Sequence, residues 1–387
     1  MRVTLRPPRA SPTLPPLLDP EGARVILGRL PDAPVGPVAA DLRTLFGPRG
    51  VLWLADGRLL VADSGHHRLL LWEDPAADGR PADGWWGQAG PREERPNRGG
   101  EVGPRGLRLP VGLAGDGSRL FVADSFNHRI LVFAGPPDRP DRMPEGLLGQ
   151  ERFDGDLPNR GSTPDGTTLH WPCGLHLDGE GRLWVADAGN RRVLMWTRPP
   201  DSPRREADLV LGQPHPRARD EAAGRGLDAV GMRWPHAVWV TEGRLFVADA
   251  GTSRIMIWDR IPDRDGAPCD RVLGQPDMVS EGHNRGRNEP GPATLAMPYA
   301  LTVLADGRLV VADTANSRLL AFAADAPSGS AALALAGQPD ASSRGDNRWR
   351  PPARDSLCWP YGLSHRGRRL AVADTGNDRV LLWELAS

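Results

Sequence analysis

The chain has 387 residues with 48 basic and 49 acidic side chains, and its formal net charge of −1 predicts no global electrostatic attraction to nucleic acid or membranes. Every basic side chain is arginine, which excludes Schiff-base and lysine-nucleophile catalysis. The three cysteines are too few for a disulfide framework, so we expect a reducing compartment, the cytoplasm.

The N-terminal segment, residues 1–22, is rich in proline, and we expect it to form an extended tail. It lacks the continuous apolar stretch of a signal peptide. Elsewhere in the sequence no apolar run is long enough to span a membrane, so we expect no membrane association.

Six segments further along the chain are near-copies of one another. Each contains the triplet VAD followed five residues later by arginine, as in GRLFVADAGTSRIMIW at 243–258. The aspartates of the six triplets are Asp63, Asp124, Asp187, Asp249, Asp313 and Asp374, with steps of 61 to 64 residues between them. Self-similarity at a nearly fixed period indicates a repeat architecture.

Each repeat contains four short apolar runs that are typical of β-strands. The first follows a recurring proline, the second ends in VAD, the third begins at the arginine, and the fourth ends in GQ or a variant of it. Four strands repeated six times predict an all-β, six-bladed β-propeller with four antiparallel strands per blade, forming one domain over residues 23–387.

The two ends of this domain predict how the ring closes. The chain stops after the third strand of the last repeat, while a spare fourth strand lies at residues 23–29. We therefore expect residues 23–29 to complete the blade formed by residues 357–385, which leaves no open sheet edge.

The repeats resemble the NHL repeat family, whose hallmark is a proline-glycine-aliphatic run followed by VAD, an asparagine and an arginine. The resemblance covers about residues 23–387. It implies a six-bladed propeller, but it does not define a function, because propellers of this kind serve as scaffolds, RNA-binding modules and enzymes.

Residues that occur in every repeat are expected to maintain the fold. The six aspartates can accept backbone N–H groups, and the arginine five residues later can pair with the aspartate or with carbonyls of a neighbouring blade. We assign these residues to structure because a catalytic group is not needed six times.

One position of the repeat does not keep the same residue type from unit to unit. It is the residue directly after the proline of the first strand. Its six occupants are Arg49, Val111, Cys173, His236, Tyr299 and Tyr361, and the position that follows is always glycine or alanine. First strands surround a propeller axis, so these side chains should converge at one mouth of the central channel. We expect Arg49, Cys173, His236, Tyr299 and Tyr361 to bind a small molecule or peptide there. The alternative is that they only fill the channel.

Cys173 and His236 are also competent metal ligands, and His170 and His176 flank Cys173. The segment WPHAV at 234–238 is similar to a zinc-binding motif of the peptidyl-hydroxyglycine amidating lyases. This resemblance implies a ligand role for His236, with Cys173 in place of a second histidine and Ala237 in place of an aspartate. A metal-assisted lyase or hydrolase with zinc or copper is therefore the alternative function. No carboxylate occupies the mouth position, which argues against a calcium-dependent lactonase.

The charges of the long loops indicate whether RNA or another protein is a suitable partner. Loop 91–109 is richer in arginine and loop 151–171 is richer in acidic residues, so the face they form carries mixed charge. Such a face disfavours RNA and fits a small ligand or another protein better. We expect a monomer.

Overall fold

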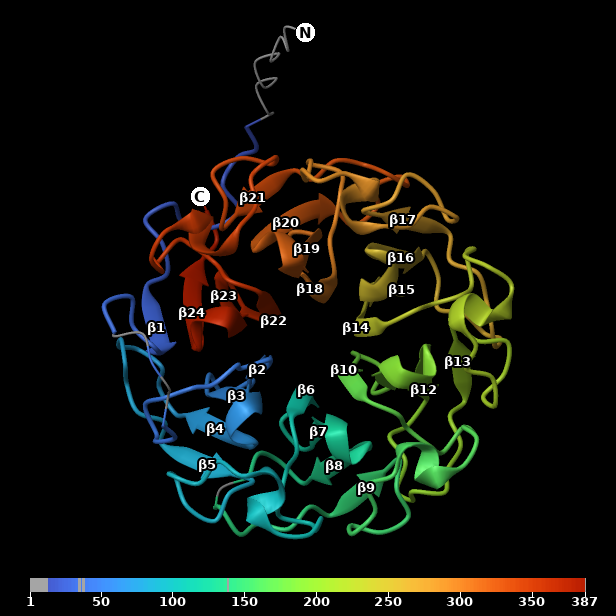
Figure 1. Ribbon diagram of the computed structural model, residues 1–387. Helices are drawn as coiled ribbons and strands as arrows, with labels where there is room; N and C mark the ends of the chain where they lie inside the picture. Colours follow the sequence, from blue (N-terminus) through green and yellow to red (C-terminus); the bar gives the residue numbers. More distant parts are fainter. Residues whose placement is uncertain (1–12, 34–35, 37–38, 138, 387) are drawn as a thin grey trace, which may run out of the picture.

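The computed structural model describes residues 13–386 except 34–35, 37–38 and 138. Six four-stranded antiparallel sheets radiate from a central axis, with β2, β6, β10, β14, β18 and β22 innermost (Figure 1). The protein is a six-bladed β-propeller, as the sequence predicts.

Each blade follows the chain order from the axis outward. Blade 1 consists of β2 (Gly50–Trp53), β3 (Leu59–Asp63), β4 (Arg68–Trp72) and β5 (Gly84–Trp86). Blade 2 consists of β6 (Pro110–Gly115), β7 (Leu120–Asp124), β8 (Arg129–Phe133) and β9 (Gly146–Leu148). Blade 3 consists of β10 (Pro172–Leu177), β11 (Leu183–Asp187), β12 (Arg192–Trp196) and β13 (Leu209–Leu211).

The second half of the ring repeats this order. Blade 4 consists of β14 (Pro235–Thr241), β15 (Arg244–Asp249), β16 (Arg254–Trp258) and β17 (Arg271–Leu273). Blade 5 consists of β18 (Pro298–Val303), β19 (Arg308–Asp313), β20 (Arg318–Ala323) and β21 (Ala334–Ala336). Blade 6 consists of β22 (Pro360–Arg366), β23 (Arg369–Asp374), β24 (Arg379–Glu384) and the N-terminal β1 (Val25–Gly28).

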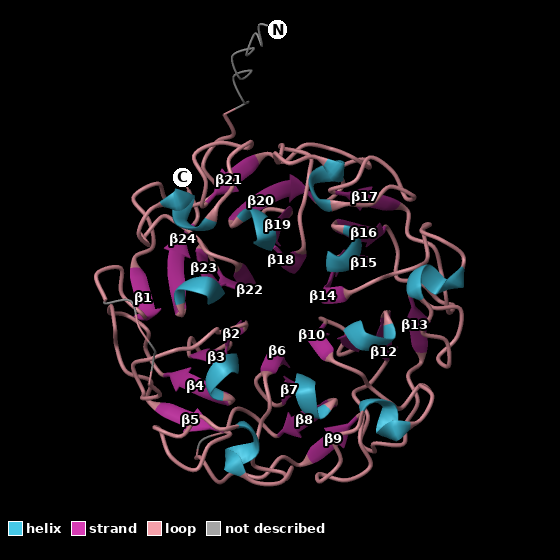
Figure 2. Ribbon diagram, viewed as in Figure 1, coloured by secondary structure: helices cyan, strands magenta, loops and turns pink. Residues whose placement is uncertain are grey.

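Short 3-10 turns connect these strands (Figure 2). One follows the second strand of every blade: η1 (Ser64–His66), η3 (Ser125–Asn127), η5 (Ala188–Asn190), η7 (Ala250–Thr252), η9 (Thr314–Asn316) and η11 (Thr375–Asn377). Others lie in the long loops between blades: η2 (Pro96–Gly99), η4 (Pro158–Gly161), η6 (Glu221–Gly224), η8 (His283–Gly286) and η10 (Asp346–Trp349). No helix in the described part of the chain is long and apolar enough to cross a membrane.

Apolar side chains from neighbouring blades pack face to face and form the core. Phe246 and Ile257 of blade 4, for example, share one buried cluster with Leu309 and Leu320 of blade 5. The tryptophans that close the third strands, including Trp72 and Trp196, are fully or almost fully buried spacers in these layers. Burial of this apolar surface is the main force that holds one blade against the next.

The ring closes through β1, as the sequence predicts. β1 pairs with β24 in antiparallel register, with Val25 opposite Leu382 and Gly28 opposite Arg379. Blade 6 is then bonded to blade 1 across the closure, where the Thr375 hydroxyl donates to the carbonyl of Pro48 at 2.6 Å. The same bond joins blades 1 and 2 through Ser64 and the carbonyl of Pro110.

The packed chain begins earlier than residue 23. Leu17 and Leu18 are 0% and 2% exposed. The Leu17 N–H donates to the carbonyl of Leu335 in β21 at 2.8 Å, and the Leu17 carbonyl accepts from Ala386 at 3.0 Å. Of the expected tail at 1–22, the described part from about residue 15 is therefore bound to blades 5 and 6, while residues 1–12 lie outside the described part.

Candidate functional site

The repeated aspartate and arginine form the framework behind the site. Arg192 is fully buried and its Nε donates to Asp187 at 2.8 Å, while its terminal nitrogens donate to the carbonyls of Asp165, Thr168 and Pro216. The other oxygen of Asp187 accepts the backbone N–H of His170 at 2.7 Å. The same arrangement, with small variations, recurs in all six blades and fixes the loop that leads into each first strand.

That loop ends directly before the proline, at a residue whose backbone is left-handed in most blades. Leu109, Trp171, Met297 and Trp359 have φ between 51° and 54°, a region that bulky side chains rarely occupy. Each is held by a hydrogen bond to the blade before it. The Trp171 N–H, for example, donates to Nδ1 of His128 at 3.1 Å.

Trp234 is the exception among these residues. Arg191 occupies the position on the preceding blade where other blades have an acceptor, and the Trp234 N–H instead bonds to Asp249 of its own blade at 2.9 Å. Its backbone is not left-handed. Even so, the Trp234 side chain faces the same cavity as Trp171 and Trp359.

The residue after the proline sits at an irregularity of the sheet. In blades 2 to 6 the register between the first and second strands shifts directly after the proline, as it does between Pro235 and Ala237. A bulge of this kind re-aims a side chain. It turns His236 and its equivalents towards the axis. In blade 2 the residue that follows must be glycine, because a Cβ on Gly112 would lie 2.0 Å from the carbonyl oxygen of Cys173.

The structure brings together all five predicted side chains. Arg49, Cys173, His236, Tyr299 and Tyr361 line one cavity of about 510 Å³ at the mouth of the channel, which we call the funnel. Its rim carries four aromatic side chains between 39% and 45% exposed: Phe126, Trp171, Trp234 and Trp359. Ligand binding by these residues remains a prediction.

The floor of the funnel is a contact cluster of four mouth residues. The ring centres of His236 and Tyr299 are 4.3 Å apart, and those of Tyr299 and Tyr361 are 4.4 Å apart. The Arg49 guanidinium lies 4.8 Å from the centre of the Tyr361 ring. The Tyr361 hydroxyl is 3.4 Å from Nδ1 of His236. These residues fill the channel and at the same time form the floor of an open cavity. Filling the channel is therefore compatible with a binding role.

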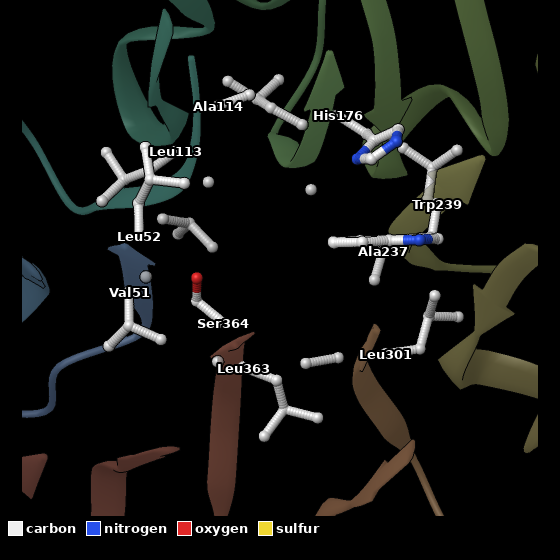
Figure 3. A pocket seen from close by; sticks show the side chains of 18 of the residues that line it. Val51, Leu52, Leu113, Ala114, His176, Ala237, Trp239, Leu301, Leu363 and Ser364 are labelled. Carbon is white, nitrogen blue, oxygen red and sulfur yellow. The ribbon is translucent and has the colours of Figure 1, made fainter. Parts of the chain in front are cut away.

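Below this floor the channel continues as a second cavity of about 230 Å³. Its wall is largely aliphatic and includes Leu113, Leu301 and Leu363, and His176 and Trp239 lie close together on one side (Figure 3). Both cavities share Arg49, Val111, His236, Tyr299 and Tyr361. The mouth residues therefore separate the funnel from the lower channel.

Burial sets the protonation states on the funnel floor. It lowers the pKa of His236 to about 3, helped by the nearby positive charge of Arg49, so the imidazole is neutral at pH 7. Burial raises the pKa of the Cys173 thiol to about 12, against the opposing effect of Arg49. It also raises the pKa of Tyr299 and Tyr361. The floor therefore presents neutral groups around one guanidinium.

The donor set does not fit the zinc or copper site expected from Cys173 and His236. Two ligands are fewer than the three or four protein ligands of a usual zinc site. His176, which could have added a ligand, bonds to the carbonyl of Val240 in the lower channel. His170 lies beside His128 and lines neither the funnel nor the lower channel. Across the described residues no group of three or more His, Cys, Asp or Glu side chains could hold a metal ion.

Sequence reasoning missed the aromatic rim. The signal was a Trp-Pro dipeptide that occurs at 171–172, 234–235 and 359–360. The residue after the proline drew attention because it varied in chemistry, whereas the residue before it is tryptophan in half of the blades. The dipeptide alone does not show that these tryptophan side chains face the funnel.

Comparison with known proteins supports the fold and goes no further. No family model and no curated protein matches this chain. A solved protein of unknown function from Bacteroides thetaiotaomicron aligns over 97% of this chain and 75% of its own, with a TM-score of 0.51 and 14% identity. At this identity the similarity shows the fold alone.

Two further structures show weaker similarity. Virginiamycin B lyase from Staphylococcus aureus aligns over 90% of this chain and 98% of its own, with a TM-score of 0.49 and 9% identity. The WD40 β-propeller domain of Doa1 aligns over 96% of each chain, with a TM-score of 0.44 and 11% identity. The six sheets of the ring themselves define the class of this protein, a six-bladed β-propeller.

Proposed function

We propose that this protein is an NHL-type propeller that binds a small molecule or peptide in the funnel. The observation that supports this most strongly is the convergence of the non-repeated mouth residues with four exposed aromatic side chains on one concave surface. Aromatic side chains gathered in a concave pocket with a few polar groups are typical of ligand sites.

The exposure of the rim tryptophans supports the same proposal. Trp171 and Trp359 are held in a conformation that costs on the order of 1–3 kcal/mol each, while their rings stay 44% and 41% exposed. The same backbone conformation occurs at Leu109 and Met297 and is absent at Trp234, so it belongs to the repeat and not to the aromatic rim. The exposure of the tryptophan rings is accounted for if they contact a ligand.

We propose ligand recognition rather than metal-assisted catalysis because the funnel has too few metal-ligating side chains. The neutral His236 and the protonated Cys173 have no third metal-ligating residue in the described funnel. The metal-assisted lyase or hydrolase is therefore not carried forward as a second function.

A fragment screen by saturation-transfer NMR tests the proposal. We expect aromatic fragments that bind the wild-type protein to lose binding to the Trp171→Ala/Trp359→Ala double variant. Trp349→Ala is the matched control, since Trp349 is 80% exposed on an outer loop and lines neither cavity. Binding that survives in the double variant, or a screen without hits, would contradict a ligand site in the funnel.

A further inference from the structure

The charge of the funnel points to a narrower class of ligand than its shape does. Among the described residues that line the funnel, Arg49 alone carries a formal charge. The same holds for the lower channel, which Arg49 also lines. Neither cavity has an aspartate or glutamate in its described wall.

Arg49 is placed as an unneutralised cation on an aromatic floor. Its guanidinium rests against the ring of Tyr361, an arrangement that orients the planar group but supplies no negative charge. A guanidinium is permanently charged and its donors match a carboxylate through two parallel hydrogen bonds. A partly buried cation without a counter-charge is costly, and a ligand that brings the counter-charge removes that cost.

No neighbour of Arg49 in the described funnel is a negatively charged group that would take the place of a ligand carboxylate. His236 is neutral at pH 7, and Cys173, Tyr299 and Tyr361 all have raised pKa values and stay protonated. No negative side chain in the described funnel repels an anion. The hydroxyl of Tyr299 or Tyr361 can donate to it as a second contact.

The rim defines the rest of the ligand. Phe126 and Trp171 stack with ring centres 6.0 Å apart, and Trp234 and Trp359 line the same cavity. Aromatic rings in such arrangements attract one another beyond the burial of their apolar area. A flat apolar body held between rim and floor would exploit these faces.

Resting on the proposed ligand site, we propose that the funnel binds an aromatic carboxylate, with the carboxylate paired to Arg49 and the ring between the rim aromatics. Two sources share this chemistry. One is a free aromatic acid, and the other is the C-terminal aromatic residue of a peptide.

Calorimetric titration with a matched pair of probes tests the charge. We expect indole-3-acetate to bind at least tenfold more tightly than indole-3-acetamide, which has the same shape but no charge. Acetate alone should not bind, because it lacks the apolar body. Equal or tighter binding of the amide would overturn the proposal.

Variants then assign the preference to Arg49. In Arg49→Gln we expect the preference for the acid to disappear, and in Arg49→Lys we expect it to persist in part. Arg366→Gln is the control, because Arg366 lies at the far end of β22 from Tyr361, is exposed, and its substitution changes the charge equally. The melting temperature of each variant shows whether it is folded. A preference that persists in a folded Arg49→Gln would overturn the assignment.

Two arms distinguish the sources. A tetrapeptide with a free C-terminal tryptophan that binds more tightly than indole-3-acetate indicates a polypeptide terminus, while the reverse order indicates a free acid. If the fragment screen places neutral or cationic aromatics in the funnel and no acid binds preferentially, this inference fails while the proposed function stands.

Discussion

Single buried arginines hold the loops of this propeller in place. Arg192 bonds to one carboxylate and three loop carbonyls without contact with water. In Arg192→Leu those acceptors lose their donors and Asp187 becomes an unpaired buried charge. We expect the free energy of unfolding to fall by about 3–5 kcal/mol in chemical denaturation.

The control for this loss is an arginine in an exposed ion pair. Arg152 pairs with Asp154 at the surface, and exposed pairs contribute little. Arg152→Leu should leave the denaturation midpoint unchanged. Equal losses in the two variants would mean that the buried networks do not support the fold.

His128 makes the rim sensitive to acid. Its Nδ1 accepts the N–H of Trp171, so the imidazole must be neutral. Burial lowers its pKa from 6.5 to about 4, with smaller effects of the neighbouring His170 and Arg108. Because the folded pKa lies below the unfolded one, the unfolded state binds the proton first. Stability is therefore full above pH 6.5 and declines as the pH falls towards 4.

The chain itself suggests the variant that tests this dependence. Ser253 and Ser317 occupy the equivalent position in other blades and accept the same backbone hydrogen bond. His128→Ser should keep the acceptor and remove one titrating group. We expect the decline in melting temperature between pH 7 and pH 4 to be shallower than in the wild-type protein. An unchanged slope would show that His128 is not among the groups responsible.

Metal content is also decided by individual side chains. Because Cys173 and His236 have no third metal-ligating partner in the described funnel, we expect purified protein to contain no stoichiometric zinc or copper by elemental analysis. One metal ion per chain that is lost in His236→Ala would contradict this expectation.

Sequence reasoning reached part of the site. Arg49, His236 and Tyr361 were found because their position varies in chemistry while its neighbours do not. The rim residues Trp171 and Trp359 could not be assigned, because their direction depends on a backbone conformation that a hydrogen bond from another blade maintains.

Among the elements, the segment before β1 behaves as part of blade 6. The indole N–H of Trp383 donates to the carbonyl of Asp19 at 2.7 Å. In other blades the equivalent tryptophan uses a carbonyl of the loop after its own strand, as Trp72 does with Arg80. The segment thus supplies the carbonyl acceptor for the indole N–H that the shortened last repeat lacks. Its proline-rich sequence concealed this role, because two buried leucines make no periodic pattern.

Truncation tests the role of this segment. Deleting residues 1–18 removes Leu17 and Leu18, whose burial contributes on the order of 3 kcal/mol. We expect a clear drop in melting temperature by calorimetry. Deleting residues 1–12 keeps every contact described for the segment and should have no effect. Identical melting of the two truncated proteins would contradict this role.

At the scale of the whole molecule, closure of the ring of blades depends on the four residues of β1, which pair with β24. The fold was predictable because six similar units must form a ring, and because the spare strand at one end matched the gap at the other. The bonds at the closure, such as Thr375 to Pro48, repeat those between other blades. Closure is therefore equivalent to an ordinary contact between blades.

Removing residues 1–29 should destabilise the entire ring, since it exposes the edge of β24 and opens the contact with blade 1. A permuted chain that carries residues 13–29 after the C-terminus through a short linker should recover stability, because Leu17 and Ala386 are already bonded. Denaturation curves of the two proteins provide the measurement. Failure of the permuted chain to recover would show that the N-terminal connection itself is needed.

The bulge after the inner-strand proline in blades 2 to 6 has a consequence for evolution and design. The glycine or alanine beside it, the aspartate behind it and the hydroxyl of the blade before it fix the backbone, and the bulged side chain contributes to none of these constraints. The chemistry of the six mouth positions can therefore change while this backbone framework stays the same. The propeller therefore serves as a scaffold with six variable positions. New ligand specificities could be selected from a library of variants at these positions.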